Sequence, residues 1–212
     1  MSYVPLHVHS HYSLLDGLTK IDDLVNKAKE EGLPALALTD HGVMHGAIEF
    51  YQKCKKAGVK PIVGVEAYIT SDRKKKEVGS EERFHLVLLA KDFEGYKNLI
   101  KLTTFAHLEG FYYKPRIDWE ILRKYSKGLI GLSACLAGEV PKAITRGLDD
   151  EKIEEIIKKY QDVFGPDDFY LEVQHHPNIP EQKIVNNKLY ELGKRLNINL
   201  VATNDSHYLN SE

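Results

Sequence analysis

Short apolar runs alternate with longer amphipathic stretches along the whole chain. The runs are rich in Val, Ile and Leu and have strand length, and they lie at residues 3–8, 35–39, 61–68, 84–90, 129–133, 169–174 and 198–203. Apolar residues with helical spacing fill the regions between them, at residues 20–31, 45–57, 92–108, 118–125, 139–146, 150–163 and 181–196. The pattern therefore predicts an α/β fold with seven strands.

This alternation is typical of a parallel sheet whose strands are joined by crossover helices. A run of seven strands suits a closed barrel at least as well as an open, doubly wound sheet. One low-complexity stretch, residues 71–82, interrupts the pattern with charges, a glycine and no apolar period. We expect an exposed excursion between two strands there, with its lysine run solvated rather than bound to DNA.

Composition and charge narrow the class of protein. The 212 residues are 42% hydrophobic and 28% charged, which is typical of a soluble globular domain, and no apolar run reaches the roughly 18 residues of a membrane span. With 29 basic and 31 acidic residues, the chain has no surplus of positive charge for gripping nucleic acid. The two cysteines form no CxxC pair and the N-terminus has no signal pattern, so we expect a cytoplasmic location.

Ten histidines are more than surface chemistry usually requires, and many of them follow predicted strands together with acidic residues. The residues at these strand ends are His7, His9, Asp40, His41, Glu66, Cys135, Asp205 and His207. In a parallel βα barrel this edge gathers residues from many loops on one face. Histidines at i and i+2 point to the same side of a strand, and imidazole with carboxylate binds Zn, Mn or Fe. The set exceeds the needs of one ion, so we expect a multinuclear metal site.

The motifs also resemble a known family. They are LHVHSHYSLLDG at 6–17, ALTDHGVMHGAIEFY at 37–51, VGVEAY at 63–68, FYYKPRID at 111–118 and ATNDSHY at 202–208. Together they resemble the PHP (polymerase and histidinol phosphatase) domain, in wording most similar to the branch at the N-terminus of bacterial replicative DNA polymerase III alpha subunits. The resemblance implies that residues 1–212 are one PHP domain, an N-terminal fragment of a longer polymerase whose polymerase active site is absent from this chain.

The resemblance implies a distorted (β/α)7 barrel that holds two or three divalent ions at the C-terminal ends of its strands. Its nine ligands would be His7, His9, Asp16, His41, Glu66, His85, Cys135, Asp205 and His207. The phosphatase branch has histidine where this chain has Asp16 and Cys135. Cys135 favours zinc, although a small buried core residue would look the same. His85 begins its strand, away from the edge that carries the other ligands, and Asp40 is expected to support a ligand rather than to be one.

The chain has neither a GxSxG nucleophile elbow nor a phosphate-binding P-loop, so metal-activated water is the simplest route to phosphate-ester hydrolysis. His9, Asp16 or His207 could relay the proton of the leaving group. Arg116 could hold a substrate phosphate through its planar guanidinium, or it could pair with Asp118 as an ordinary loop arginine.

The resemblance leads to one main hypothesis and two alternatives. The main one is a metal-dependent phosphoesterase that hydrolyses phosphodiester bonds, a 3'-5' exonuclease with a proofreading role, whose partners are DNA, reached through the full-length polymerase, and other polymerase III domains or subunits. The first alternative is a non-catalytic docking module stabilised by its metals. The second is a free-standing phosphatase of the histidinol phosphate type.

Overall fold

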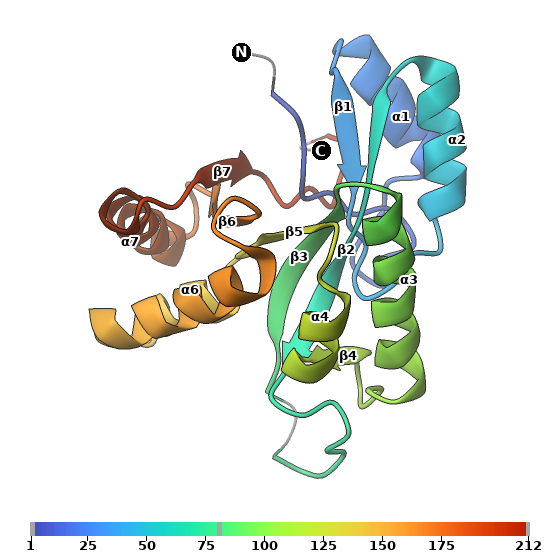
Figure 1. Cartoon of the computed structure of the whole chain (residues 1–212). Coiled ribbons are helices and arrows are strands. Elements are labelled where there is room, and N and C mark those ends of the chain that lie inside the picture. Colours follow the sequence, from blue (N-terminus) through green and yellow to red (C-terminus); the bar gives the residue numbers. More distant parts are fainter. Residues whose placement is uncertain (1–2, 80–81, 211–212) are drawn as a thin grey trace.

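The computed structural model describes residues 3–79 and 82–210 (Figure 1). The helices are α1 (Ile21–Glu30), α2 (Ala47–Ala57), α3 (Phe93–Leu108), α4 (Trp119–Tyr125), α5 (Glu139–Thr145), α6 (Asp150–Phe164) and α7 (Pro180–Leu196). The strands are β1 (Ala35–Leu38), β2 (Lys60–Thr70), β3 (Phe84–Ala90), β4 (Arg116–Asp118), β5 (Leu129–Leu132), β6 (Phe169–Gln174) and β7 (Leu200–Thr203). All seven predicted helices are present, with bounds within two residues of the prediction, because their apolar faces repeat with helical spacing.

The strands form one curled sheet in the order β1-β2-β3-β5-β6-β7, and the short β4 pairs with β2 beside that path. β3 runs antiparallel to both of its neighbours, β2 and β5. The other strand pairs are parallel. The predicted α/β barrel class is confirmed, but the expectation of a purely parallel sheet is wrong, because the described residues between β2 and β3 form a loop and no helix.

The predicted first strand, residues 3–8, is not a regular strand, yet it lies where a strand would close the ring. On one side Ala37 N–H donates to the Pro5 carbonyl and Thr39 N–H to the Val8 carbonyl. On the other side Val8 bridges to Ser206 in parallel. The ladder is irregular because the Thr39 hydroxyl, rather than a backbone carbonyl, accepts from Val8 N–H at 2.8 Å. The segment thus connects β1 with the residues that follow β7, and it holds His7, with His9 directly after it, inside the ring.

The reversed direction of β3 decides where His85 lies. His85 is the second residue of β3 and pairs with Tyr68 near the end of β2. Because β3 is antiparallel, its beginning lies at the same edge as the carboxyl ends of the parallel strands. His85 therefore lies at the edge that carries the other candidate ligands, which periodicity alone did not predict.

Helices cover the outer face of the sheet, with α1 and α2 beside β1 and β2 and α6 and α7 at the other end (Figure 1). The main core cluster packs apolar side chains of β2, β3, β5 and β6 against α3 to α7, and a second cluster joins α1, α2 and β1. Within residues 3–79 and 82–210, no helix is both long and apolar enough to cross a membrane.

The predicted excursion lies between β2 and β3, and its described lysines are exposed as expected. Arg73 is the exception, since its side chain is only 4% exposed. Its guanidinium donates to the carboxylates of Asp118, Glu109 and Glu120 at 2.7–3.0 Å. This ion-pair network, buried at Arg73 and Asp118, fastens the base of the excursion to β4, α4 and the end of α3.

Candidate metal centre

The innermost ligands come from three distant parts of the chain. His7 and His9 lie on the first segment, Glu66 lies in the middle of β2, and Asp205 follows β7. His7 Nε2 lies 3.2 Å from Glu66 Oε1 and 3.1 Å from Asp205 Oδ1. His9 Nε2 lies 3.4 Å from Glu66 Oε2 and 3.2 Å from Asp205 Oδ1. Two imidazoles and two carboxylates therefore converge on one point inside the ring.

A second group surrounds the other side of Glu66. His41 Nδ1 lies 2.6 Å from Glu66 Oε2, and His85 Nδ1 lies 2.8 Å from Glu66 Oε1. Cys135 Sγ lies 3.6 Å from His85 Nδ1 and 3.8 Å from Glu66 Oε1. Glu66 thus stands between the two groups and could bridge two ions, and Cys135 faces the site rather than the apolar core.

The outer group lies at the mouth of the site. Asp16 Oδ2 lies 2.7 Å from His41 Nε2 and 3.1 Å from His207 Nε2. The Asp16 side chain is 53% exposed, whereas His7, His9 and Glu66 are completely buried. The structure therefore brings all nine predicted ligands together, in a series that leads from the interior of the ring to solvent.

The donor atoms fit divalent cations. Five buried polar atoms here have no hydrogen-bond partner: His7 Nε2, His9 Nε2, His41 Nδ1, Glu66 Oε2 and Asp205 Oδ1. Each unsatisfied buried group costs about 1–3 kcal/mol, and buried polar groups are normally paired. The nitrogen and carboxylate oxygen atoms of this group face one another at 2.6–3.4 Å. A cation bound among them would be the missing partner of each atom. Three sets, His7/His9/Glu66, His41/Glu66/His85 and His9/His41/His207, each have ligand atoms close enough to hold an ion.

Neighbouring charges keep the carboxylates of the metal centre ionised, which is the form that binds cations. Burial would raise the pKa of Glu66, but the neighbouring His7, His41 and His85 outweigh it and hold that pKa well below its ordinary value. Burial would likewise raise the pKa of Asp205, and His7 and His9 instead lower it to about 2. Both carboxylates therefore stay ionised. Burial raises the pKa of the Cys135 thiol, so this sulfur becomes a thiolate ligand only beside a bound cation.

A buried carboxylate that the sequence analysis did not select orients His7. Glu172 Oε1 lies 2.7 Å from His7 Nδ1, and it also accepts from the Gln174 amide at 3.0 Å and from the Thr203 hydroxyl. With the Nδ1 proton directed at Glu172, the lone pair of Nε2 faces the metal-capable group. The signal was present in the sequence, since Glu172 and Gln174 place two polar residues at i and i+2 of a predicted strand.

Asp40 supports ligands through two serines, as the sequence analysis expected. Its carboxylate accepts from the backbone and hydroxyl of Ser10 and from the Ser13 hydroxyl. Since the Ser13 hydroxyl donates to Asp40, its oxygen is left to accept from His9 Nδ1–H at 2.9 Å and from His41 N–H at 3.1 Å. This network assigns the proton of His9 to Nδ1 and leaves Nε2 available as a ligand atom.

Backbone strain gathers at the same place. Leu15 precedes Asp16, Ala134 precedes Cys135, and Asp205 is itself a candidate ligand; these three non-glycine residues have φ values of 67°, 62° and 49°. Such conformations cost about 1–3 kcal/mol each and cluster at functional sites. The chain accepts this cost at one candidate ligand and at the residue before each of two others, which is consistent with selection for a site rather than for stability.

Arg116 is the one predicted site residue that lies elsewhere. Its side chain is completely buried, and its guanidinium donates to the carbonyls of Gly110, Arg73 and Lys75 at 2.7–3.2 Å. A substrate phosphate cannot reach a guanidinium enclosed in this way, so the expectation that Arg116 binds substrate is corrected. Asp118 accepts from Arg73 instead. The segment FYYKPRID, residues 111–118, therefore has a structural role, because it forms the base of the loop between β2 and β3.

Comparisons with known proteins agree with this geometry. Residues 5–176 match the PHP domain family. The chain is 50% identical to the DNA polymerase III subunit alpha of Aquifex aeolicus, with 99% of this chain and 18% of that protein aligned. It is 47% identical to the protein of the same name from Thermus aquaticus, with 100% and 18% aligned. The chain thus spans about 18% of the length of these relatives.

Solved structures show the same fold at low identity. A putative metal-dependent phosphoesterase from Bifidobacterium adolescentis superposes with a TM-score of 0.61 at 16% identity, covering 98% of this chain and 88% of that one. An amidohydrolase from Chromobacterium violaceum gives 0.62 at 16% identity, covering 96% and 87%. With the family match over residues 5–176, these likenesses lead to one conclusion: the chain belongs to the PHP domain family.

Proposed function

We propose that this chain is a metal-dependent phosphoesterase that hydrolyses phosphodiester bonds with metal-activated water. The observation that carries the proposal is the group of five buried ligand atoms around Glu66 that have no hydrogen-bond partner among the described residues, within a set of nine ligand side chains that opens to solvent at Asp16. A site built only for structure would not need an exposed end. Two or three divalent ions, of Zn, Mn or Fe, fit its nitrogen, oxygen and sulfur donors.

When bound, such ions supply hydroxide near neutral pH and offset the negative charge of phosphate oxygens. The chain orients the two imidazole rings that would bind these ions. Glu172 fixes the ring of His7, and Ser13 fixes the ring of His9. Of the three candidate proton carriers, His9 is completely buried and locked to Ser13. Asp16 and His207 lie at the mouth and contact each other, so they are the groups best placed to relay a proton to a leaving oxygen.

The proposed substrate is a DNA end. The relatives named DNA polymerase III subunit alpha support a DNA substrate and a longer cytoplasmic polymerase of which residues 1–212 form one domain. Our proposal for its activity there is a 3'-5' exonuclease with a proofreading role. DNA and other polymerase III domains or subunits would be its partners. Tethering to a polymerase would supply the DNA at high effective concentration, which suits a chain with a net charge of -2.

The test is hydrolysis of bis(4-nitrophenyl) phosphate and of 3'-mismatched primers by the purified chain. Activity should disappear with chelator and return with Mn or Zn, and Asp16→Asn or His207→Asn should lower kcat by about 100-fold or more. His45→Asn is the matched control, because His45 is exposed and outside the three metal-capable sets. A metal-loaded chain that cleaves no phosphodiester with any of these ions would refute the proposal.

The second candidate function is a non-catalytic module in which metals staple the fold. It is favoured by the complete burial of His7, His9 and Glu66, because ions held there would cross-link the first segment to β2. In that case metal would raise stability without giving activity. A histidinol phosphatase is less well supported, since positions 16 and 135 carry aspartate and cysteine instead of the histidines of that branch.

A further inference from the structure

A shallow groove of about 420 Å³ runs alongside the metal centre, between the beginning of β3 and α5. We call it the basic groove, and it is lined by Glu82, Arg83, His85, Ala137, Lys142 and Arg146. His85 N–H donates to the Ala137 carbonyl, which fixes the segment before α5 against β3. Because His85 is also a candidate metal ligand, the groove begins at the metal centre itself.

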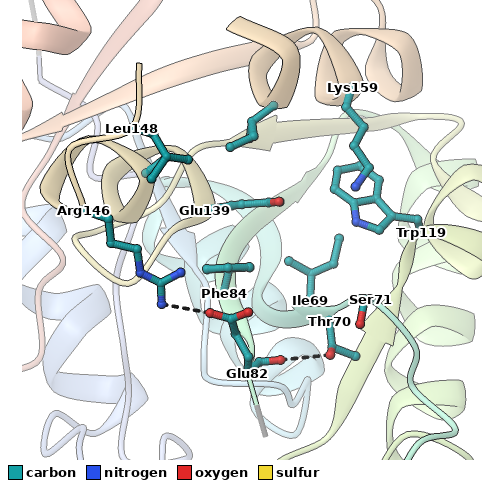
Figure 2. A pocket seen from close by; sticks show the side chains of 12 residues that line it. Ile69, Thr70, Ser71, Glu82, Phe84, Trp119, Glu139, Arg146, Leu148 and Lys159 are labelled. Carbon is teal, nitrogen blue, oxygen red and sulfur yellow. Dashed lines mark hydrogen bonds and ion pairs between the residues drawn. The ribbon is translucent and has the colours of Figure 1, made fainter. Parts of the chain in front are cut away.

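The groove carries more positive than negative charge. Among the residues that the structure describes, Glu82 is the only carboxylate lining the groove, and it pairs with Arg146 at 2.8 Å, as Figure 2 shows. Lys142 has no ion-pair partner among the described residues, and its Nζ lies 5.5 Å from the centroid of the Phe84 ring. The Arg83 guanidinium lies 5.8 Å from the ring of Tyr68, which itself packs against His85. An anion in the groove would meet at least one charge, that of Lys142, that no described carboxylate compensates.

A deeper cavity of about 480 Å³ adjoins the groove, and the two share Glu82 and Arg146 (Figure 2). Its wall includes the apolar side chains of Ile69, Phe84 and Trp119. On the side away from Arg146, Lys159 places its Nζ 3.7 Å from the centroid of the Trp119 ring. Lys159 also has no ion-pair partner within residues 3–79 and 82–210.

One carboxylate of this cavity, Glu139, already has a hydrogen-bond donor among its neighbours. The Tyr160 hydroxyl donates to Glu139 at 2.8 Å, and burial raises the pKa of the Glu139 carboxyl. The cavity therefore combines aromatic and aliphatic walls with a cation at each end, Arg146 and Lys159. Its volume lies within the roughly 300–1,000 Å³ that small organic ligands occupy.

We propose that the basic groove and the adjoining cavity bind the strand of nucleic acid next to the phosphodiester at the metal centre. A neighbouring phosphate lies against Lys142 and Arg83 in the groove, and the following nucleoside enters the cavity between Trp119 and Arg146. Positive grooves combined with aromatic faces are the usual means of binding single strands without sequence preference. This inference rests on the proposed function, and it adds a binding site for the substrate strand outside the nine metal ligands.

The first test is binding of a fluorescent phosphorothioate oligothymidylate, which resists hydrolysis, to the Mn-loaded chain at several salt concentrations. Each phosphate contact contributes about -0.7 to the slope of log affinity against log salt for single strands. Lys142→Gln should make the slope shallower by about 0.7, because it removes a phosphate contact, and Lys142→Gln and Lys159→Gln should each weaken binding at low salt by about threefold. Lys158→Gln is the matched control, since Lys158 is exposed, lies next to Lys159 in α6, and lines neither the basic groove nor the cavity.

The second test compares substrates. Lys142→Gln should lower the ratio of kcat/KM for oligothymidylate to that for bis(4-nitrophenyl) phosphate by about threefold, through KM, because the smaller diester has no second phosphate for the groove. Binding and slopes equal to those of Lys158→Gln in both variants overturn the inference. The inference is also overturned if polyglutamate displaces the oligonucleotide at an equal concentration of charge, because that result would indicate an acidic protein partner. Lysine-dependent binding without any hydrolysis by the unmodified chain would refute the proposed function alone.

Discussion

Ser13 offers a sharp test of how the metal centre is held, because one buried hydroxyl connects three parts of it. Its oxygen accepts from His9 Nδ1–H at 2.9 Å and from His41 N–H at 3.1 Å, and its proton goes to Asp40 at 2.8 Å. Ser13→Ala removes all three hydrogen bonds and leaves two buried N–H groups without an acceptor. No other contact of the metal ligands is removed directly.

The magnitude follows from those contacts. A typical hydrogen bond contributes about 0.5–1.5 kcal/mol net, and a buried group left unpaired costs about 1–3 kcal/mol. We expect Ser13→Ala to lower the free energy of unfolding by about 2–4 kcal/mol. We also expect metal affinity to fall by about 10- to 100-fold, because the His9 ring loses the acceptor that fixes its proton on Nδ1 and its Nε2 toward the site.

Ser10→Ala is the matched control. Ser10 is equally buried and its hydroxyl also donates to Asp40, at 2.9 Å, but it contacts no metal ligand. Urea unfolding of the chelated proteins should show that both variants lose stability. Competition with a chromophoric chelator should show weaker metal binding for Ser13→Ala alone.

Two results would refute this reasoning. If Ser10→Ala weakens metal binding as much as Ser13→Ala, the Asp40 network acts through general packing of the first loop and not through the proton of His9. If Ser13→Ala binds metal with unchanged affinity, the hydroxyl does not fix the ring, and Nε2 keeps its direction by packing alone.

Three further predictions concern stability. Chelation should lower the midpoint of thermal unfolding in calorimetry, because ions that bind only the native state add about 2.7 kcal/mol at 100 times their Kd; an unchanged midpoint would contradict metal binding to the folded chain. Arg73→Ala should cost about 3–5 kcal/mol in urea unfolding, because it leaves Asp118 buried without its partner, whereas Arg195→Ala, which breaks only exposed pairs, should cost less than about 1 kcal/mol. Burial raises the pKa of Glu139, so the native state keeps this proton to higher pH than the unfolded chain, and wild-type stability is lost as pH rises from the ordinary value of 4.5 through the raised one. Glu139→Gln should abolish that loss, and equal pH profiles for both proteins in urea unfolding would exclude it.

The local elements of this protein were readable from the sequence because their causes are local. Apolar spacing predicted the seven helices, and β-branched and aliphatic runs predicted six regular strands and the first segment of the ring. The candidate ligands were also readable, since histidines and carboxylates placed directly after strands meet at one edge of any such barrel. The three-residue strand β4 was missed, because its pattern is too short to have a period.

Only the tertiary structure decided which side chains meet. The direction of β3 is a property of its pairing with β2 and β5, and it alone moves His85 to the edge of the other ligands. Glu172 became recognisable when β6 placed it against His7, 165 residues away in the sequence. Arg116 carried the right chemistry for phosphate, but three backbone carbonyls enclose it. Residue type and spacing determine what a side chain can do, whereas burial and long-range pairing determine what it can reach.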